Sequence, residues 1–219
     1  MTQAPAKAKT PAQSAWPAAL AVLAVGGLYL VLPEPLTFGP SWLLLVVVFV
    51  LLVPVVIARV RGSFELNQML GYLLLGVVTA AMLWSLYLLV RSLPRHTLPP
   101  LALLRSAAAL WATNILVFAS WYWRLDAGGP NARHLRNSHF KGDFLFPQMT
   151  LAPSTQRPID PAWSPGFVDY LFLAFNTSTA FSPTDSPVLS RWAKVLMMIQ
   201  SSISLATLAL LAARAVNIL

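Results

Sequence analysis

Long runs of apolar residues, separated by short polar segments, dominate the chain. A helix needs about 20 predominantly apolar residues to cross a bilayer. The runs that we expect to form such helices are Trp16–Leu32, Trp42–Ala58, Met69–Val90, Leu101–Trp123 and Val188–Val216. A shorter apolar run covers Phe167–Ser182. The pattern therefore predicts an all-α fold: a polytopic integral membrane protein with five to six transmembrane helices.

The composition agrees with this class. Hydrophobic residues make up 57% of the 219 residues and charged residues only 10%, whereas a soluble domain carries about 25% charged residues. The net charge is +8, but the basic residues flank the apolar runs, where they set topology and meet anionic lipid. We therefore expect no nucleic-acid partner. Cysteine is absent, which excludes disulfides, thiolate metal sites and cysteine nucleophiles.

The chain divides into four parts. Residues 1–15 form a basic tail without periodicity, which predicts disorder. Residues 16–123 form a region of four transmembrane helices, 124–166 a polar loop, and 167–219 a C-terminal unit of a short segment and a last helix. Within the loop, Asp143–Met149 (DFLFPQM) is apolar. We expect it either to pack beneath the C-terminal unit or to lie against the membrane surface.

The lysine and arginine bias predicts the orientation. With the N-terminus in the cytoplasm, most of the loop basic residues fall on the cytoplasmic side. Aromatic residues near the ends of the spans, including Tyr122 and Trp123, are expected as anchors at the membrane interface.

Phe167–Ser182 could span about 24 Å as a helix, less than the hydrocarbon thickness of about 30 Å. It is therefore either a thin full span or a re-entrant half-helix. The orientation favours a full span with the C-terminus in the cytoplasm. Asp169 suits its first turn, as an N-terminal capping group.

A polar cluster follows in this segment, and a polar stripe marks one face of the last helix. Polar groups at membrane depth are tolerated only where protein or a water-filled cavity surrounds them. The stripe lines a hydrated pathway or, as the alternative, packs helices together. The candidate pathway residues are Asn176, Thr177, Ser178, Thr179, Ser182, Thr184, Asp185, Gln200, Ser204 and Thr207.

Motifs for enzyme chemistry do not occur in the sequence. It contains no nucleophile elbow, no HExxH motif and no phosphate-binding loop. We therefore expect no enzymatic activity, no cofactor and no metal site.

The C-terminal unit resembles the pore module of two-helix potassium channels, whose pattern is DYLYFSFTTLTTVGYGD. Matching positions are Asp169–Phe172, Phe175, Thr177, Thr179 and Asp185. Ungapped, the Gly-Tyr-Gly of the filter falls on Ser182-Pro183-Thr184, and shifted by two residues it falls on Ala180-Phe181-Ser182. Both glycines are absent in either alignment. A potassium filter needs stacked backbone carbonyls, and glycine makes that backbone accessible. The resemblance therefore implies a channel-like helix-turn-helix with a filter that is not of the potassium type.

The unit is also similar to a family of bacterial, actinobacterial-type polytopic membrane proteins of unknown function. The positions that carry this similarity are Asp169, Phe175, Phe181, Asp185, Val188, Ser190 and Arg191. This resemblance implies a multi-pass protein of the bacterial cytoplasmic membrane and assigns no activity.

These observations lead to a channel-like permeation protein as the first hypothesis, with the lipid bilayer, ions and further copies of the chain as partners. A non-conducting scaffold or accessory protein is the alternative. A small secondary transporter is the third, although such proteins usually show internal repeats and more intramembrane charge.

Overall fold

The computed structural model describes residues 14–92, 98–136, 142–150, 163–179 and 186–216. In the described part the regular secondary structure is helical, apart from one isolated bridge between Phe144 and Val188. The elements are α1 (Trp16–Tyr29), η1 (Glu34–Leu36), α2 (Leu43–Val60), α3 (Phe64–Ser92), α4 (Pro100–Leu125), η2 (Asp126–Gly128), α5 (Pro130–Arg136), α6 (Pro147–Thr150), α7 (Phe167–Thr179) and α8 (Arg191–Val216).

The all-helical fold class is confirmed for this part of the chain. Four helices, α2, α3, α4 and α8, are long and apolar enough to cross a membrane. Helix α1 has 14 residues and α7 has 13, so both are shorter than the predicted runs. Helix α1 ends ahead of Pro33, and the last described residue of α7 is Thr179.

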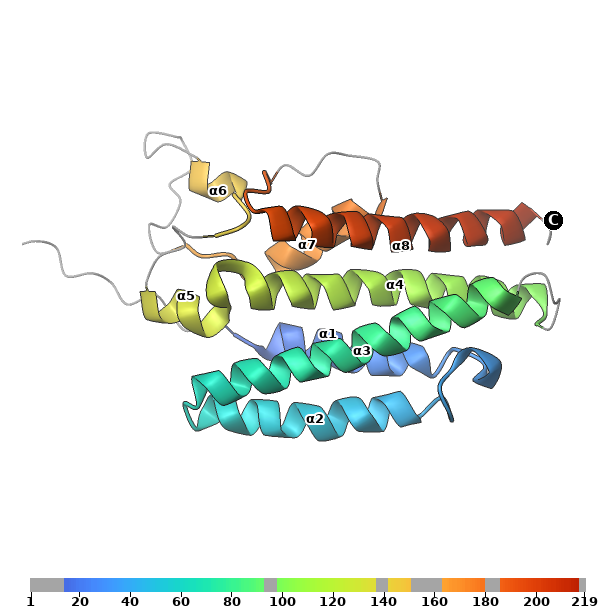
Figure 1. The fold of residues 1–219 in the computed structure, drawn as a ribbon, viewed down its shortest axis with the longest axis horizontal. Helices are drawn as coiled ribbons and strands as arrows, with labels where there is room; N and C mark the ends of the chain where they lie inside the picture. Colours follow the sequence, from blue (N-terminus) through green and yellow to red (C-terminus); the bar gives the residue numbers. More distant parts are fainter. Residues whose placement is uncertain (1–13, 93–97, 137–141, 151–162, 180–185, 217–219) are drawn as a thin grey trace, which may run out of the picture.

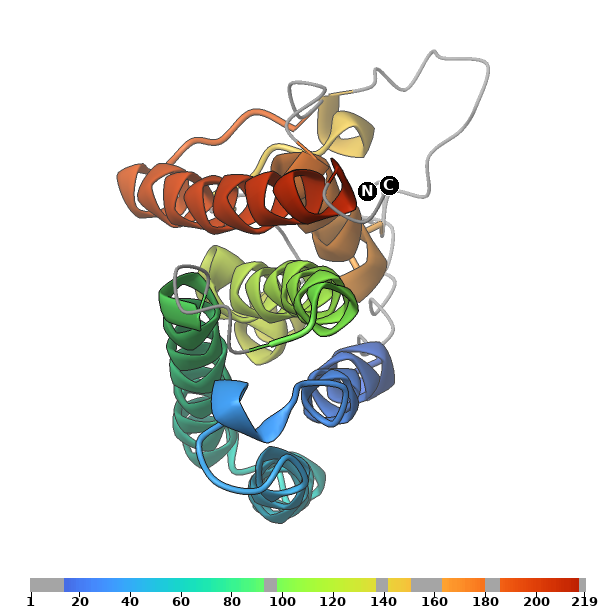
Figure 2. The same ribbon diagram turned by 90° about the vertical axis from the view of Figure 1, so that its right-hand side faces the viewer.

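Helix α4 lies at the centre of the bundle. Figure 2, viewed along the bundle, shows α7 and α8 on one side of α4, with α1 and α3 beside it and α2 farthest away. Helices α1, α3, α7 and α8 all contact α4. Its buried side chains are accordingly numerous and include Ala107, Leu110 and Phe118. A helix that is covered on so many sides can carry polar groups as long as its neighbours supply partners.

We call the end of the bundle where α1 begins and α4 ends the proximal end, and the other the distal end (Figure 1). Helices α1 to α4 alternate in direction, and η1 packs on α3 at the distal end. There the Tyr29 hydroxyl accepts hydrogen bonds from the Phe38 backbone N–H, at 3.0 Å, and from Ser85 Oγ, at 3.4 Å. These bonds attach the connection after α1 to α3.

Helix α7 starts at the proximal end and stops near the middle of the bundle. Phe167, in its first turn, stacks edge-on against Trp123 in the last turn of α4. Near its other end, Phe175 meets Trp111 about halfway along α4, and Ser178 meets Ser204 about halfway along α8. The 13 residues of α7 extend about 20 Å.

The chain is back at the proximal end when α8 begins. The carbonyl of Pro187 accepts a hydrogen bond from the Leu145 N–H, and the Leu189 N–H donates to the Asp143 carbonyl, at 2.9 and 2.8 Å. Helices α7 and α8 therefore start at the same end and run in the same direction (Figure 1). The expected full span over 167–182 would place the start of α8 at the distal end. In the described residues the start of α8 lies at the proximal end instead, as the re-entrant alternative requires.

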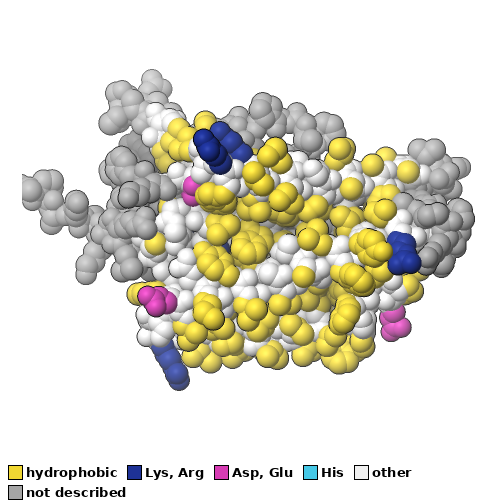
Figure 3. Space-filling model, in the orientation of Figure 1, with side chains coloured by type: hydrophobic (Ala, Val, Ile, Leu, Met, Phe, Trp, Pro, Cys, Tyr) yellow, Lys and Arg dark blue, Asp and Glu magenta, His cyan; other side chains and the backbone are white. Residues whose placement is uncertain are grey.

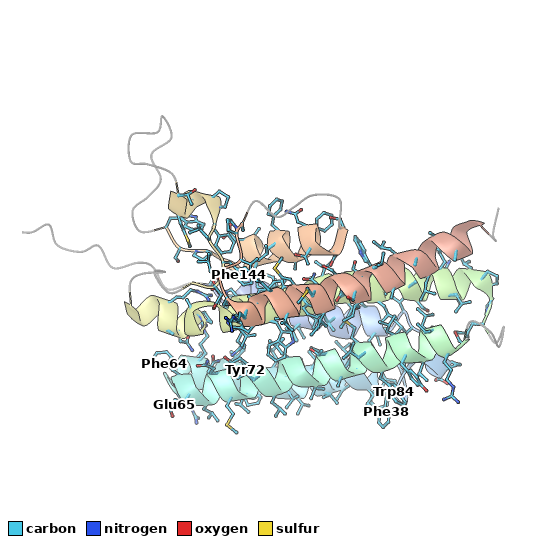
Figure 4. The ribbon with its side chains drawn as sticks, turned by 45° about the horizontal axis from the view of Figure 1, so that its top comes forward. Phe38, Phe64, Glu65, Tyr72, Trp84 and Phe144 are labelled. Atoms are coloured by element: carbon cyan, nitrogen blue, oxygen red, sulfur yellow. The ribbon has the colours of Figure 1, made fainter. Side chains whose placement is uncertain are left out.

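The apolar loop segment Asp143–Met149 packs inside the proximal end of the bundle. This agrees with the first of the two interpretations of the sequence, that the segment packs beneath the C-terminal unit. Phe144 is buried among three aromatic rings, with centroids 5.2 Å from Tyr122, 6.3 Å from Tyr170 and 6.4 Å from Trp192. These rings belong to α4, α7 and α8, so Phe144 joins the three helices where α8 begins (Figure 4). Tyr122 and Trp123, which we expected as anchors at the membrane interface, are buried within the bundle.

The outer surface is predominantly apolar. Figure 3 shows hydrophobic side chains across the middle of one face, with acidic and basic side chains toward the two ends. Large exposed side chains on the long helices include Phe49, Leu73 and Leu205. A soluble monomer rarely exposes so continuous an apolar surface, and an integral membrane protein requires one.

Candidate functional site

The candidate site lies where the last turn of α7 meets the middle of α8 and α4. The last four carbonyls of a helix have no partner within that helix. Here α8 supplies partners by side chain: Ser201 Oγ donates to the Thr177 carbonyl at 3.3 Å, and Ser204 Oγ to the Ser178 carbonyl at 2.5 Å. The carbonyls of Thr177 and Ser178 therefore have partners on α8.

Gln200 is the centre of this contact and is fully buried. Its Nε2 donates to the Ala174 carbonyl and to Ser178 Oγ, both at 2.7 Å. Its Oε1 accepts a hydrogen bond of 2.5 Å from the Tyr122 hydroxyl on α4. Both N–H groups and the amide oxygen are therefore used, and one side chain joins three helices.

Asn114 adds a second link between α4 and α8. Its Nδ2 donates to the backbone carbonyl of Gln200 at 3.2 Å. Its Oδ1 is buried and has no hydrogen-bond partner. The Asn114 amide nitrogen therefore donates one hydrogen bond to α8, while the amide oxygen accepts none. A buried polar atom without a hydrogen-bond partner is uncommon.

The other predicted residues divide into three groups. Thr177 and Thr207 are buried, and their hydroxyls donate to carbonyls of their own helices. Asn176 and Thr179 are half-buried, and the Thr179 hydroxyl donates to the Asn176 carbonyl at 3.1 Å. The candidates outside the described residues are Ser182, Thr184 and Asp185.

The cluster is a compact hydrogen-bonded joint. The predicted common face of Gln200, Ser204 and Thr207 is confirmed, since all three are buried against the neighbouring helices. A cavity between α1, α2, α3 and α4 is lined by no residue of α7 or α8. Asp169, as expected, lies in the first turn of α7, where its Oδ2 accepts a 2.7 Å hydrogen bond from the Gly166 N–H.

A second polar cluster, at the proximal end, was not predicted. Asp126 follows α4 and is fully buried. Its carboxylate accepts hydrogen bonds of 2.5 Å from the Tyr170 hydroxyl and from the Asp143 N–H. Arg133 lies with its guanidinium 5.3 Å from the centre of the Tyr170 ring, and donates to the Asp126 carbonyl at 2.7 Å.

Electrostatics couple these three side chains. Burial lowers the pKa of Arg133, while the neighbouring Tyr170 and Asp126 raise it. The cluster fixes the start of α7 on the end of α4, so it sets the position from which the half-helix enters the bundle. The sequence offered one hint: an acid directly after an apolar run and before Gly128-Gly129-Pro130, a helix-terminating sequence.

Comparison with known proteins adds no relative: no protein-family model, no curated protein and no solved structure matches this chain.

Proposed function

We propose that this protein is a multi-pass protein of the bacterial cytoplasmic membrane and that its C-terminal unit, α7 and α8 with their connection, forms a permeation path. The carrying observation is the half-helix: α7 stops near the middle of the bundle, and α8 begins again at the proximal end. Broken helices at membrane depth are tolerated where they are buried in protein or line a cavity, and transport proteins use their ends to bind ions.

The polar joint supports this proposal by holding the half-helix in place. With Ser201, Ser204 and Gln200 satisfying its carbonyls, α7 does not need water to remain inside the bundle. The path itself then belongs to the connection between Thr179 and Ser186, which contains the candidates Ser182, Thr184 and Asp185.

A homo-oligomer forms part of the proposal. Helix α8 exposes Val195, Met198 and Leu205 on the side away from its neighbours. This surface suits either lipid or a second copy. Copies arranged around α8 would enclose a path between them, as the resemblance to two-helix channels implies.

Ion flux in proteoliposomes tests permeation. We expect the purified protein to conduct a cation, and Asp185→Asn to reduce or reshape that flux by removing a negative charge from the connection. Ser202→Ala serves as the matched control, because Ser202 is exposed on α8 and its hydroxyl bonds only within that helix. Equal flux from wild type and Asp185→Asn would place the path elsewhere.

One observation favours the alternative, a non-conducting scaffold. The described polar atoms of α7 and α8 in the joint all have protein partners, so they would serve only to hold helices together. Flux no higher than that of empty liposomes, from demonstrably folded protein with several cations and anions, would support the scaffold and reject the permeation path.

A further inference from the structure

A cavity opens at the proximal end between α1, α2, α3 and α4, away from the polar joint. It has a volume of about 50 Å³ and is open to the outside. That is several times the roughly 10–15 Å³ that one water molecule needs, so the cavity has room for a small polar group and not for a whole lipid. Apolar side chains such as Val22, Leu52 and Leu74 line most of it, while Arg59, Asn67 and Arg124 line its polar part. An apolar volume that ends in positive charge suits an amphiphile with an anionic group.

Arg124 is the unusual feature of this cavity. Its side chain is buried, with 9% of its surface exposed, although it lies in a helix apolar enough to cross a membrane. Its Nη1 donates to the Asn67 carbonyl at 3.0 Å, and its guanidinium lies 5.9 Å from the centre of the Trp123 ring. Among the described residues, no carboxylate pairs with it. A guanidinium has five N–H donors, so most of its donors lack a protein acceptor here.

The fold makes room for this guanidinium. A Cβ on Gly71 would overlap the guanidinium of Arg124, so the glycine of α3 permits the arginine to lie flat against that helix. Asn67, one turn earlier, is held by its own side chain: Nδ2 donates to the Val55 carbonyl at 2.8 Å, and Oδ1 accepts from Asn131 at 3.3 Å. The charged group is thus held in place at the cavity wall.

A second arginine reinforces the charge. Arg59, near the end of α2, also lines the cavity and lies close enough to Arg124 for the two cations to repel each other. An anion between them would relieve that repulsion.

We propose that this cavity binds the phosphate of one anionic phospholipid at Arg124, with the acyl chains of that lipid outside the cavity, in the bilayer. Arginine recognises phosphate through paired N–H donors, and basic pockets between membrane helices bind anionic headgroups. The lipid site requires that the bundle is inserted in a membrane, but it does not require ion permeation, so lipid binding and ion flux can fail separately. If neither lipid binding nor ion flux is observed, the bundle is not inserted in a membrane.

Native mass spectrometry of the full-length, delipidated protein in detergent tests the proposal. The probes are phosphatidylglycerol, phosphatidylcholine and inorganic phosphate. We expect one phosphatidylglycerol to bind at least about tenfold more tightly than phosphatidylcholine. Both lipids carry an anionic phosphate, but the choline ammonium makes the phosphatidylcholine headgroup neutral overall and is repelled by Arg59 and Arg124. Equal binding of the two lipids would overturn the site. Displacement of phosphatidylglycerol by millimolar phosphate would show a free-anion site and overturn the lipid assignment.

Two variant pairs locate the site. Arg124→Gln should weaken phosphatidylglycerol binding about tenfold, whereas Arg61→Gln, an exposed arginine at the same end outside the cavity, should not. Gly71→Ala keeps the charge but displaces the guanidinium, and should also weaken binding. Its control is Gly76→Ala, where an added Cβ meets no atom within 4 Å. Unchanged binding in Gly71→Ala, in protein as folded as wild type by circular dichroism, would mean that Arg124 only holds the Asn67 carbonyl.

Discussion

Gln200 shows how a single side chain can hold a broken helix in an apolar bundle. Its amide bonds to α7 through Ala174 and Ser178 and to α4 through Tyr122. No one of these bonds needs to be strong. A buried carbonyl without a partner costs free energy, however, so the joint fails as a unit when its central side chain is removed.

Gln200→Leu is expected to destabilise the protein by about 1–3 kcal/mol, since it leaves the buried Tyr122 hydroxyl without its acceptor and removes the hydrogen bonds to Ser178 Oγ and to the Ala174 carbonyl. Tyr122→Phe should cost less, because the ring contacts remain. The two changes share one bond, so the double variant should be more stable than additivity predicts. Equilibrium unfolding in detergent micelles measures the four free energies. Strict additivity would mean that the two side chains do not interact.

Tyr170 ties α7 to α4 through a charged acceptor. Tyr170→Phe removes only the hydroxyl that donates to Asp126 and keeps the ring beside Phe144 and Phe146. We expect a loss of about 1.5–3 kcal/mol, the range for a hydrogen bond to a charged group. Tyr87→Phe is the control: Tyr87 is exposed and accepts only a long bond from Arg91. A loss no larger than the control's would mean that Asp126 is satisfied without Tyr170.

At the scale of elements, α1 depends on close approach to α2. A Cβ at Gly26 would lie 3.1 Å from the backbone Cα of Leu45, whereas one at Gly27 would meet nothing within 4 Å. Backbone cannot move aside as a side chain can. Packing of α1 against α2 therefore requires glycine at position 26 but not at position 27.

Gly26→Ala should lower stability by about 1–3 kcal/mol through overpacking. Gly27→Ala should be neutral or stabilising, by up to about 1 kcal/mol, because alanine is the better helix former. Thermal unfolding of the two variants in the same detergent compares them directly. Similar destabilisation by both would indicate that α1 and α2 lie farther apart than the structure has them.

The elements were largely predictable because one physical quantity, apolar run length, determines them. Predicted Leu101–Trp123 became α4 at Pro100–Leu125, and predicted Trp42–Ala58 became α2 at Leu43–Val60. The contacts between helices were harder to predict from the sequence. The polar face of Gln200, Ser204 and Thr207 follows from helical spacing, but its partner Tyr122 lies 78 residues away, and no local pattern specifies that distance.

Asp126 and the direction of α7 escaped prediction for a related reason. The positive-inside bias counts charges in loops and cannot tell a half-helix from a full span of similar composition. In the structure the direction of α8 relative to α7 depends on hydrogen bonds between distant segments. One of them, from the Leu189 N–H to the Asp143 carbonyl, holds the start of α8 at the end of the bundle where α7 also starts.

At the scale of the whole molecule, the direction of α7 and α8 determines which helix ends lie on the same side of the membrane. If α1, α2, α3, α4 and α8 all cross the membrane and α7 does not, the connection between α2 and α3 and the start of α8 lie on one side. The connection between α1 and α2 and the end of α8 lie on the other (Figure 1). A full span at α7 would move both ends of α8 to the opposite sides.

Because the chain contains no cysteine, a single introduced cysteine is the only thiol that can be labelled, and its labelling shows on which side of the membrane that position lies. Exposed positions are available at Ser63, Arg191, Glu34 and Ala212. We expect a membrane-impermeant maleimide to label Ser63→Cys and Arg191→Cys from the same face of sealed vesicles, and Glu34→Cys and Ala212→Cys from the opposite face. The comparison of Ser63 with Arg191 is decisive, since only a re-entrant α7 leaves them together. Labelling of these two from opposite faces would reject the half-helix, and with it the observation on which the permeation path rests.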